Sequence, residues 1–151
     1  MGRAAPLLVG GGFLFITLFA LAPLLFGDSG LGMASRIVFG GLCHQMPGRS
    51  LFVDGHQAAI CHRCTGIYLG LALGGFFALV RRVDPRSPRV WLLGAAPTLI
   101  QLALAVPWTF FDAWWMRLVS GALTGAAGGL LMASGLSGAP SDATPREPGR
   151  P

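Results

Sequence analysis

Cysteine and histidine residues are concentrated in one short part of this sequence. All three Cys and all three His lie within 22 residues: Cys43, His44, His56, Cys61, His62 and Cys64. Thiolates and imidazoles are the ligands that zinc and copper take in proteins. Thiols can also carry out disulfide exchange. Neither membrane solubility nor helix packing requires such a grouping, so this cluster is the candidate site of any chemistry.

The first interpretation of the cluster is a metal site. The pair Cys61-x-x-Cys64, together with Cys43 and one imidazole, supplies four ligands of the kind that zinc prefers. The imidazole would come from His44, His56 or His62. Copper is the second choice, because thiolates select the cuprous ion.

The second interpretation is thiol redox chemistry. A Cys-x-x-Cys pair with a further Cys in an adjoining loop suits disulfide exchange between Cys43 and the pair Cys61 and Cys64. The arrangement is similar to membrane thiol oxidoreductases of the disulfide-bond-forming and vitamin K epoxide reductase types, which implies a quinone as cofactor. A third interpretation is purely structural, with the cysteines buried as small apolar groups or joined in a disulfide. The residues alone leave open whether the protein is an enzyme.

The elements that must position these residues are apolar. Hydrophobic residues make up 53% of the 151 residues and charged residues 11%, against roughly 25% charged in soluble domains. Four stretches approach the ~20 residues that cross a bilayer as a helix: 6–26, 58–80, 90–108 and 114–136. The sequence predicts an all-α, four-transmembrane-helix bundle over residues 1–136, embedded in the lipid bilayer. Residues 27–57 form its Cys/His-containing outer loop.

Arginines in the loops predict the orientation. Residues 81–89 carry Arg81, Arg82, Arg86 and Arg89 against a single acid, Asp84, so this connection is expected in the cytoplasm. Both termini are then cytoplasmic, and the Cys/His cluster lies on the outer face. The tail 137–151, rich in Pro, Gly and Ser, is predicted to be disordered. Because the arginines form no basic face, we expect no nucleic-acid partner.

The first apolar stretch has a second interpretation. Arg3, the apolar run and Ala20-Leu21-Ala22 resemble a signal peptide with its cleavage site. Pro23 follows that site directly and disfavours cleavage. We therefore expect the first helix to be retained in the protein.

Glycines recur at four-residue spacing in two of the predicted helices. Small residues at this spacing let helix backbones approach closely in lipid, so we expect these faces to pack on each other or on a second copy of the protein. Cys61, Cys64 and Tyr68 would share the opposite face of the second helix. The glycines are Gly66, Gly70 and Gly74 in the second helix, and Gly121, Gly125 and Gly129 in the fourth.

Polar residues near the cluster are candidates to orient its ligands. They are Gln45, Arg49, Arg63, Tyr68 and Arg117. Arg117 would stabilise a thiolate or an anion there, or else extend to the membrane interface. We interpret Asp112 as a solvated turn residue, Asp54-Gly55 as a turn before the second helix, and Gln101 as facing the bundle.

Several of these residues together resemble a known family. Cys43-His44-Gln45, Arg49-Ser50, Gly55-His56 and Cys61-x-Arg63-Cys64-Thr65-Gly66-Ile67-Tyr68-x-Gly70 are similar to the prokaryotic membrane-protein family called domain of unknown function 2085. Arg117, Gly121 and Gly125 match its C-terminal pattern, and the resemblance runs from about Ile37 to Gly129. Where members often carry an acid after the proline of the third helix, this chain has Gln101. The resemblance implies a membrane protein and assigns no activity.

Overall fold

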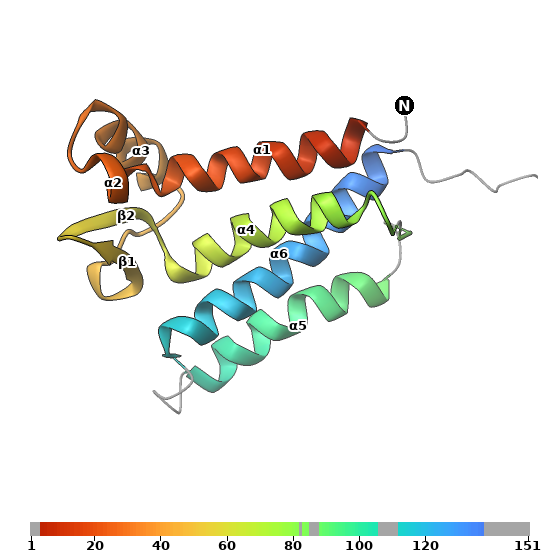
Figure 1. The fold of residues 1–151 in the computed structure, drawn as a ribbon. Coiled ribbons are helices and arrows are strands. Elements are labelled where there is room, and N and C mark those ends of the chain that lie inside the picture. The colour runs from red at the N-terminus through yellow and green to blue at the C-terminus, as the bar shows by residue number, and fades with distance from the viewer. Residues whose placement is uncertain (1–3, 82, 85–87, 106–111, 138–151) are drawn as a thin grey trace, which may run out of the picture.

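The structure is a computed structural model that describes residues 4–81, 83–84, 88–105 and 112–137 (Figure 1). It is mostly helical. The helices are α1 (Ala4–Ala20), α2 (Ala22–Phe26), α3 (Gly30–Gly40), α4 (His62–Phe77), α5 (Pro88–Ala105) and α6 (Trp114–Leu136). A short 3₁₀ turn, Pro47–Arg49, precedes strands β1 (Ser50–Val53) and β2 (His56–Cys61), which pair antiparallel.

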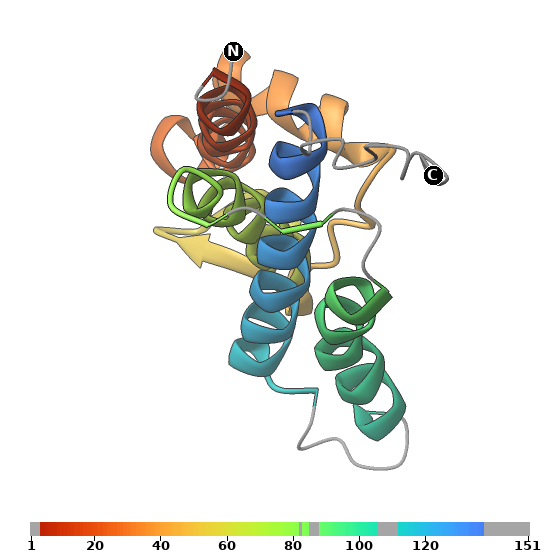
Figure 2. The ribbon, with the colours of Figure 1, turned by 90° about the vertical axis from the view of Figure 1, so that its right-hand side faces the viewer.

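Helices α4 and α6 form the centre of the molecule. α1 packs mainly on α4, and α5 packs mainly on α6, on the side away from α1 (Figure 2). α2, α3 and the two strands gather at one end of this helical layer and cover the start of α4 (Figure 1). We call this group of elements, residues 22–61, the cap. The cap and the first turn of α4 hold all the Cys and His residues.

The glycine faces of α4 and α6 lie against each other. A Cβ at Gly66 would collide with the carbonyl oxygen of Leu118, and one at Gly125 would collide with that of Ile67. The same reciprocal approach is repeated along the whole contact, through Gly70, Gly74, Gly121 and Gly129. Of the two alternatives stated above, packing of one face on the other within a single chain is the one the structure contains.

The prediction of a purely α-helical chain is wrong at the start of the second apolar stretch. Residues 58–61 belong to β2, and α4 begins only at His62. A continuous apolar run has no periodicity that separates a buried strand from a helix, and Ala58, Ala59 and Ile60 are indeed all buried. Asp54 and Gly55 both have positive φ, 49° and 82°, as a two-residue hairpin turn requires. This turn therefore joins β1 to β2 and does not lead directly into a helix.

The first apolar stretch is also divided. α1 ends at Ala20 and α2 starts at Ala22. Pro23 has no N–H to donate to the carbonyl of Phe19, four residues before it. The buried Ser35 hydroxyl of α3 donates to that carbonyl instead, at 2.8 Å. Gly27, with φ of 56°, then reverses the chain into α3, which lies inside the segment predicted to be a loop.

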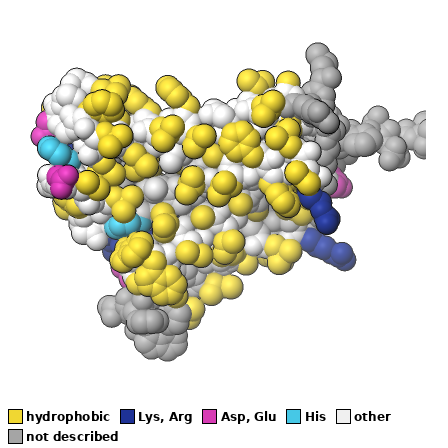
Figure 3. Space-filling view, in the orientation of Figure 1, with side chains coloured by type: hydrophobic (Ala, Val, Ile, Leu, Met, Phe, Trp, Pro, Cys, Tyr) yellow, Lys and Arg dark blue, Asp and Glu magenta, His cyan; other side chains and the backbone are white. Residues whose placement is uncertain are grey.

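Four full-length membrane spans are not supported. Among the described residues, α5 (18 residues) and α6 (23 residues) are long and apolar enough to cross a membrane. α1 is apolar but has 17 residues, and α4 has 16. Hydrophobic side chains cover the visible face between charged groups at the two ends (Figure 3). The predicted tail beyond residue 137 and the end of the third predicted helix, 106–108, lie outside the described residues.

Candidate three-cysteine site

Three cysteines from three different elements meet where the cap covers α4. Cys43 follows α3, Cys61 ends β2, and Cys64 lies in the first turn of α4. Their Sγ atoms all lie within 4.8 Å of one another. Cys43 is buried, Cys61 and Cys64 are half-buried, and all three are free thiols. The chain therefore folds back from residue 43 onto the start of α4, and the three sulfurs form one group.

Apolar packing in the cap holds this geometry. Ala20, Phe39, Cys43, Ala59 and Ile60 form one buried cluster, against which Cys61, Cys64 and Tyr68 pack. The Phe39 ring lies 5.9 Å from that of Tyr68, and its carbonyl accepts the N–H of Cys43 at 2.8 Å. Because Tyr68 and Cys64 face the cap while the glycines face α6, the two sides of α4 are used for different contacts.

Hydrogen bonds favour a thiolate at Cys61. The pKa of Cys61 is lowered, first by a hydrogen bond from the Cys64 thiol, and then by the backbone N–H of Cys64, the Cys43 thiol and the backbone N–H of Arg63. Burial opposes this shift but does not cancel it. Cys61 also immediately precedes α4, where the helix dipole favours negative charge. Its own N–H donates to the Sγ of Cys43 at 3.2 Å. The group therefore contains a sulfur whose thiolate form, favoured by these hydrogen bonds, can bind a cation or attack an electrophile.

The sulfurs border a cavity of about 340 Å³. Three arginines reach this cavity from the 3₁₀ turn, α4 and α6. The lining residues are Leu42, Cys43, His44, Gln45, Met46, Arg49, Cys61, Arg63, Cys64 and Arg117. The site is thus open to a small solute and carries an excess of positive side chains.

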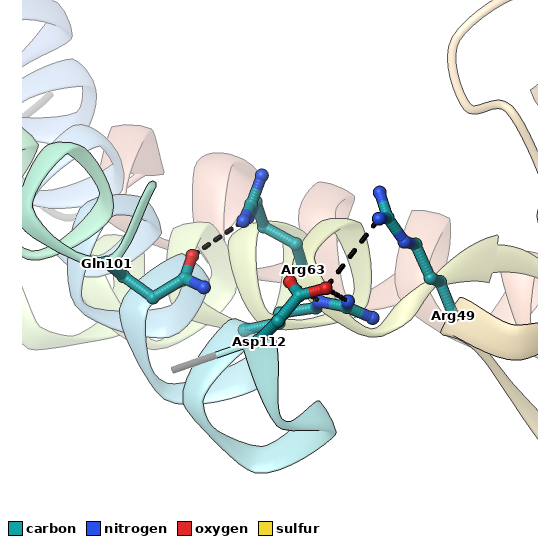
Figure 4. A network of polar contacts seen from close by, with 5 residues as sticks. Arg49, Arg63, Gln101 and Asp112 are labelled. Carbon is teal, nitrogen blue, oxygen red and sulfur yellow. Dashed lines mark hydrogen bonds and ion pairs between the residues drawn. The ribbon is translucent and has the colours of Figure 1, made fainter. Parts of the chain in front are cut away.

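Asp112 is the acid that these arginines share. The buried Arg117 donates its Nε to Asp112 Oδ1 at 2.8 Å and pairs with Oδ2, while Arg49 lies 3.6 Å from Oδ2 (Figure 4). The hydrogen bond from Arg117 holds the pKa of Asp112 below its usual range, with help from the charges of Arg49 and Arg63. The interpretation of Asp112 as merely solvated is therefore wrong, because this carboxylate fixes two arginines at the rim of the site.

Arg63 turns toward a different partner. Its Nη2 donates to the Oε1 of the buried Gln101 on α5 at 2.6 Å (Figure 4). Gln101 thus faces the bundle, as expected, and links α5 to the start of α4. Arg63 reaches both this amide and the cavity lined by the thiols.

The histidines do not converge with the sulfurs. His44 is exposed and lines the cavity. His56 lies at the far end of β2, against Gly27. The buried His62 packs its ring 6.0 Å from Trp114, and its Nδ1 has no hydrogen-bond partner among the described residues. Within the described part of the chain, no imidazole nitrogen joins the three-sulfur group.

Other motif residues shape the backbone near the site. The side chain of Gln45, a residue with φ of 48°, donates to the carbonyl of Arg36 at 2.8 Å, and Gln57 donates to the carbonyl of Gln45. The Thr65 hydroxyl donates to the carbonyl of Cys61, which is a bond within the helix start. Gln45 and Thr65 therefore support the loop and the helix terminus, and their hydrogen bonds go to backbone carbonyls.

Two important residues had not been singled out from the sequence. Arg36 of α3 donates to the carbonyl of Gln57 at 3.1 Å and lies 3.6 Å from Asp28, so it ties α3 to the hairpin. Phe39 of α3 is the aromatic residue on which Cys43 and Tyr68 pack. The only available signal was an amphipathic pattern between residues 30 and 40, which the long-loop interpretation ignored.

Comparison with known proteins places this chain in a family. The family model described as "Predicted membrane protein", the domain of unknown function 2085, matches residues 43–132. The chain belongs to this membrane-protein family. The match begins at Cys43 and includes all three cysteines, the arginines that line the cavity and the glycine contact between α4 and α6.

Two uncharacterised archaeal proteins are similar to parts of the chain. One, from Methanocaldococcus jannaschii, is 41% identical over 58 residues, which are 37% of this chain and 37% of that protein. Another, from Methanothermobacter thermautotrophicus, is 37% identical over 71 residues, which are 47% of this chain and 56% of that protein. The chain thus spans between about a third and a little over half of these relatives. No solved structure matches it.

Proposed function

We propose that the three-cysteine site of this membrane protein binds a thiophilic metal ion, with Zn²⁺ as the first candidate and Cu⁺ as the second. The supporting observation is that three sulfurs lie within 4.8 Å of one another. A disulfide would use only two of them. Zn–S bonds of about 2.3 Å in a tetrahedral site separate the sulfurs by about 3.8 Å, so a small inward movement of each side chain would bring all three sulfurs to metal-binding distance.

His44 is the fourth ligand that we propose for zinc. It follows Cys43 directly and is the histidine that lines the cavity with the three cysteines. His56 and His62 are held elsewhere by packing against Gly27 and Trp114. If His44 does not bind, three sulfurs leave one position open to a solute, as in catalytic zinc sites, or provide a trigonal set for Cu⁺.

The charges around the sulfurs suit a thiolate-rich metal. Three thiolates leave one net negative charge on Zn²⁺ and two on Cu⁺. Arg49, Arg63 and Arg117 border the same cavity, and Asp112 neutralises only part of their charge. The N–H of Cys61 donates to the Sγ of Cys43, which is the kind of surrounding contact that tunes metal ligands. We place the site on the outer face, from the arginines of residues 81–89.

Metal content of the purified protein tests the proposal. Detergent-solubilised protein should contain one zinc or copper ion per chain, and Cys61→Ser should release it. His44→Ala should weaken zinc binding by about tenfold or more, whereas the matched His56→Ala should bind as tightly as the unaltered chain. A chain that binds neither metal when reduced, or that binds equally well without Cys61, would contradict the proposal.

A thiol oxidoreductase is the second candidate, favoured by the lowered pKa of Cys61 and its hydrogen bond from Cys64. In this reaction Cys61 and Cys64 form a disulfide, and their two electrons and two protons reduce a quinone to the hydroquinone. Cys43 would exchange with that disulfide. Protein purified with thiols blocked should then show a Cys61–Cys64 disulfide and no metal, and Cys64→Ser should trap a mixed disulfide. Stoichiometric metal with three reduced thiols would exclude it.

A further inference from the structure

A second cavity lies in the half of the molecule away from the cysteines. It is a groove of about 960 Å³ between the end of α4, the start of α5 and the later part of α6. All the side chains that line it are apolar. They are Leu73, Gly74, Phe76, Phe77, Val80, Val83, Val90, Leu93, Gly94, Pro97, Leu123, Ala126, Ala127 and Leu130. The groove exists because α5 packs mainly on α6, which leaves the space between α4 and α5 open.

The groove is shorter than one leaflet of a bilayer. Its α5 wall runs from Val90 to Pro97, and seven residues of helix rise by about 10 Å. Half of a bilayer's hydrocarbon core is about 15 Å thick. The groove therefore begins near one end of the helices and stops before the midplane, so it fits the part of an acyl chain that lies nearest the headgroup in that leaflet.

Arginines flank the end of this groove. Val80 and Val90 line it, and their direct neighbours Arg81 and Arg89 are exposed. The connection 81–89 also contains Arg82 and Arg86 in its sequence, against one acid, Asp84. Figure 3 shows basic side chains at this end, beside the apolar face. A guanidinium group can donate two parallel hydrogen bonds to the oxygens of one phosphate.

We propose that this groove binds an anionic phospholipid. An acyl chain lies between α4 and α5, and the phosphate headgroup contacts Arg81 and Arg89. A purely apolar occupant, such as a partner helix, would offer the arginines at the entrance no negative group to bind. Free phosphate would make no apolar contact with the walls of the groove. A lipid with a negative headgroup satisfies both halves of the site.

Lipid binding by the full chain in defined detergent tests the proposal, for example by native mass spectrometry. The probes are phosphatidylglycerol, phosphatidylcholine of the same acyl chains, and inorganic phosphate. We expect phosphatidylglycerol to bind more tightly than phosphatidylcholine, and phosphate to compete weakly. Equal binding of the two lipids, or full displacement of lipid by phosphate, would overturn the proposal.

Matched variants separate the headgroup contact from net charge. Each arginine near an anionic lipid surface contributes about fivefold in binding, so Arg81→Gln with Arg89→Gln should weaken phosphatidylglycerol binding by roughly 25-fold. The control, Arg146→Gln with Arg150→Gln, removes the same charge from residues outside the described part of the chain and should weaken phosphatidylglycerol binding by much less. Leu93 is an exposed residue of the groove wall. Leu93→Trp should weaken the binding of both lipids, because the larger side chain blocks the space for the acyl chain. An equal loss of phosphatidylglycerol binding in the two double arginine variants would refute the site.

Discussion

The two sides of α4 are built on different principles. One side is a row of glycines that places its backbone directly against the backbone of α6. The other side carries Cys64 and Tyr68 and faces the cap through larger side chains and a cavity. The first side has no room for chemistry, because no side chain intervenes. The second gathers groups from three elements around a solute-sized space. The contrast shows how a single helix can be held rigidly and still contribute to a site.

The largest expected effect is on the glycine side. Gly70→Leu would drive a side chain into the backbone of Ala122 and Ala126. Overpacking in a close contact costs about 1–3 kcal/mol or more, and here the obstacle is backbone that cannot rotate away. We expect at least 3 kcal/mol of destabilisation and loss of folded protein, measured by thermal unfolding in detergent. Gly11→Leu is the control, because a Cβ at Gly11 meets nothing. Equal behaviour of the two variants would mean that the glycine contact is not tight.

The next effect is on the cap side, at Ile60. This residue is fully buried beneath the cysteines. Ile60→Ala should cost about 2–4 kcal/mol through the cavity it leaves. It should also speed the reaction of Cys43 with a maleimide, because the packing that buries that thiol is loosened. Leu73→Ala, which removes an exposed side chain from α4 far from the cap, should change neither quantity. Slow thiol labelling in Ile60→Ala would show that the cap does not depend on this packing.

A smaller effect is expected from Arg117. Its ion pair with Asp112 stabilises the fold only while the carboxylate is charged. Because the pKa of Asp112 is lowered in the folded protein, this stabilisation is present above the unfolded value of about 3.9 and is lost as pH falls through the lower folded value. Arg117→Gln should therefore destabilise the protein at pH 7 and leave less difference at very low pH.

The companion variant Arg49→Gln compares the two ion pairs of Asp112, one with Arg49 and one with Arg117. Arg49 is half-exposed and 3.6 Å from Asp112, so its loss should cost less than about 1 kcal/mol. Both variants should weaken metal binding, Arg117→Gln by about tenfold. Equal unfolding free energies for the two variants would show that burial of Arg117 contributes nothing.

The smallest effect is expected between α5 and α6. The hydroxyls of Thr98 and Thr124 share a hydrogen bond of 2.7 Å. Thr98→Val removes it, together with the 3.2 Å hydrogen bond between the Thr98 hydroxyl and the Ser120 carbonyl, at nearly constant shape and should cost about 1 kcal/mol, measured by unfolding in detergent. The metal content should not change. A larger loss would indicate that α5 is held more by this bond than by apolar contact.

The sequence was most informative where the relevant spacing is local. Glycines at four-residue intervals predicted faces that pack closely, on each other or on a second copy, and the structure has these faces of α4 and α6 in contact. α6 also has the expected bounds, Trp114–Leu136. The placement of Gln101 toward the bundle followed from the cost of an amide in lipid. These inferences needed only helix geometry and the nature of the solvent.

The cap was less predictable, because long-range contacts decide it. Residues 58–60 are apolar enough for a helix but pair with β1, and their burial comes from the return of α2 and α3 over them. Asp54-Gly55 carried a hairpin signal that the apolar run obscured. The approach of Cys43 to Cys61 depends on this folded cap, so spacing along the chain could suggest the three-sulfur group but not that His56 and His62 pack elsewhere.

X-ray absorption at the metal edge of the purified protein tests the central claim most directly. We predict a single zinc or copper ion per chain, surrounded by three sulfurs at about 2.3 Å, with one nitrogen or oxygen added in the case of zinc. The sulfur count should fall by one in Cys43→Ser, the cysteine contributed from outside the Cys61-x-x-Cys64 pair. A metal surrounded by nitrogen and oxygen alone, or a spectrum unchanged in Cys43→Ser, would contradict a three-sulfur metal site.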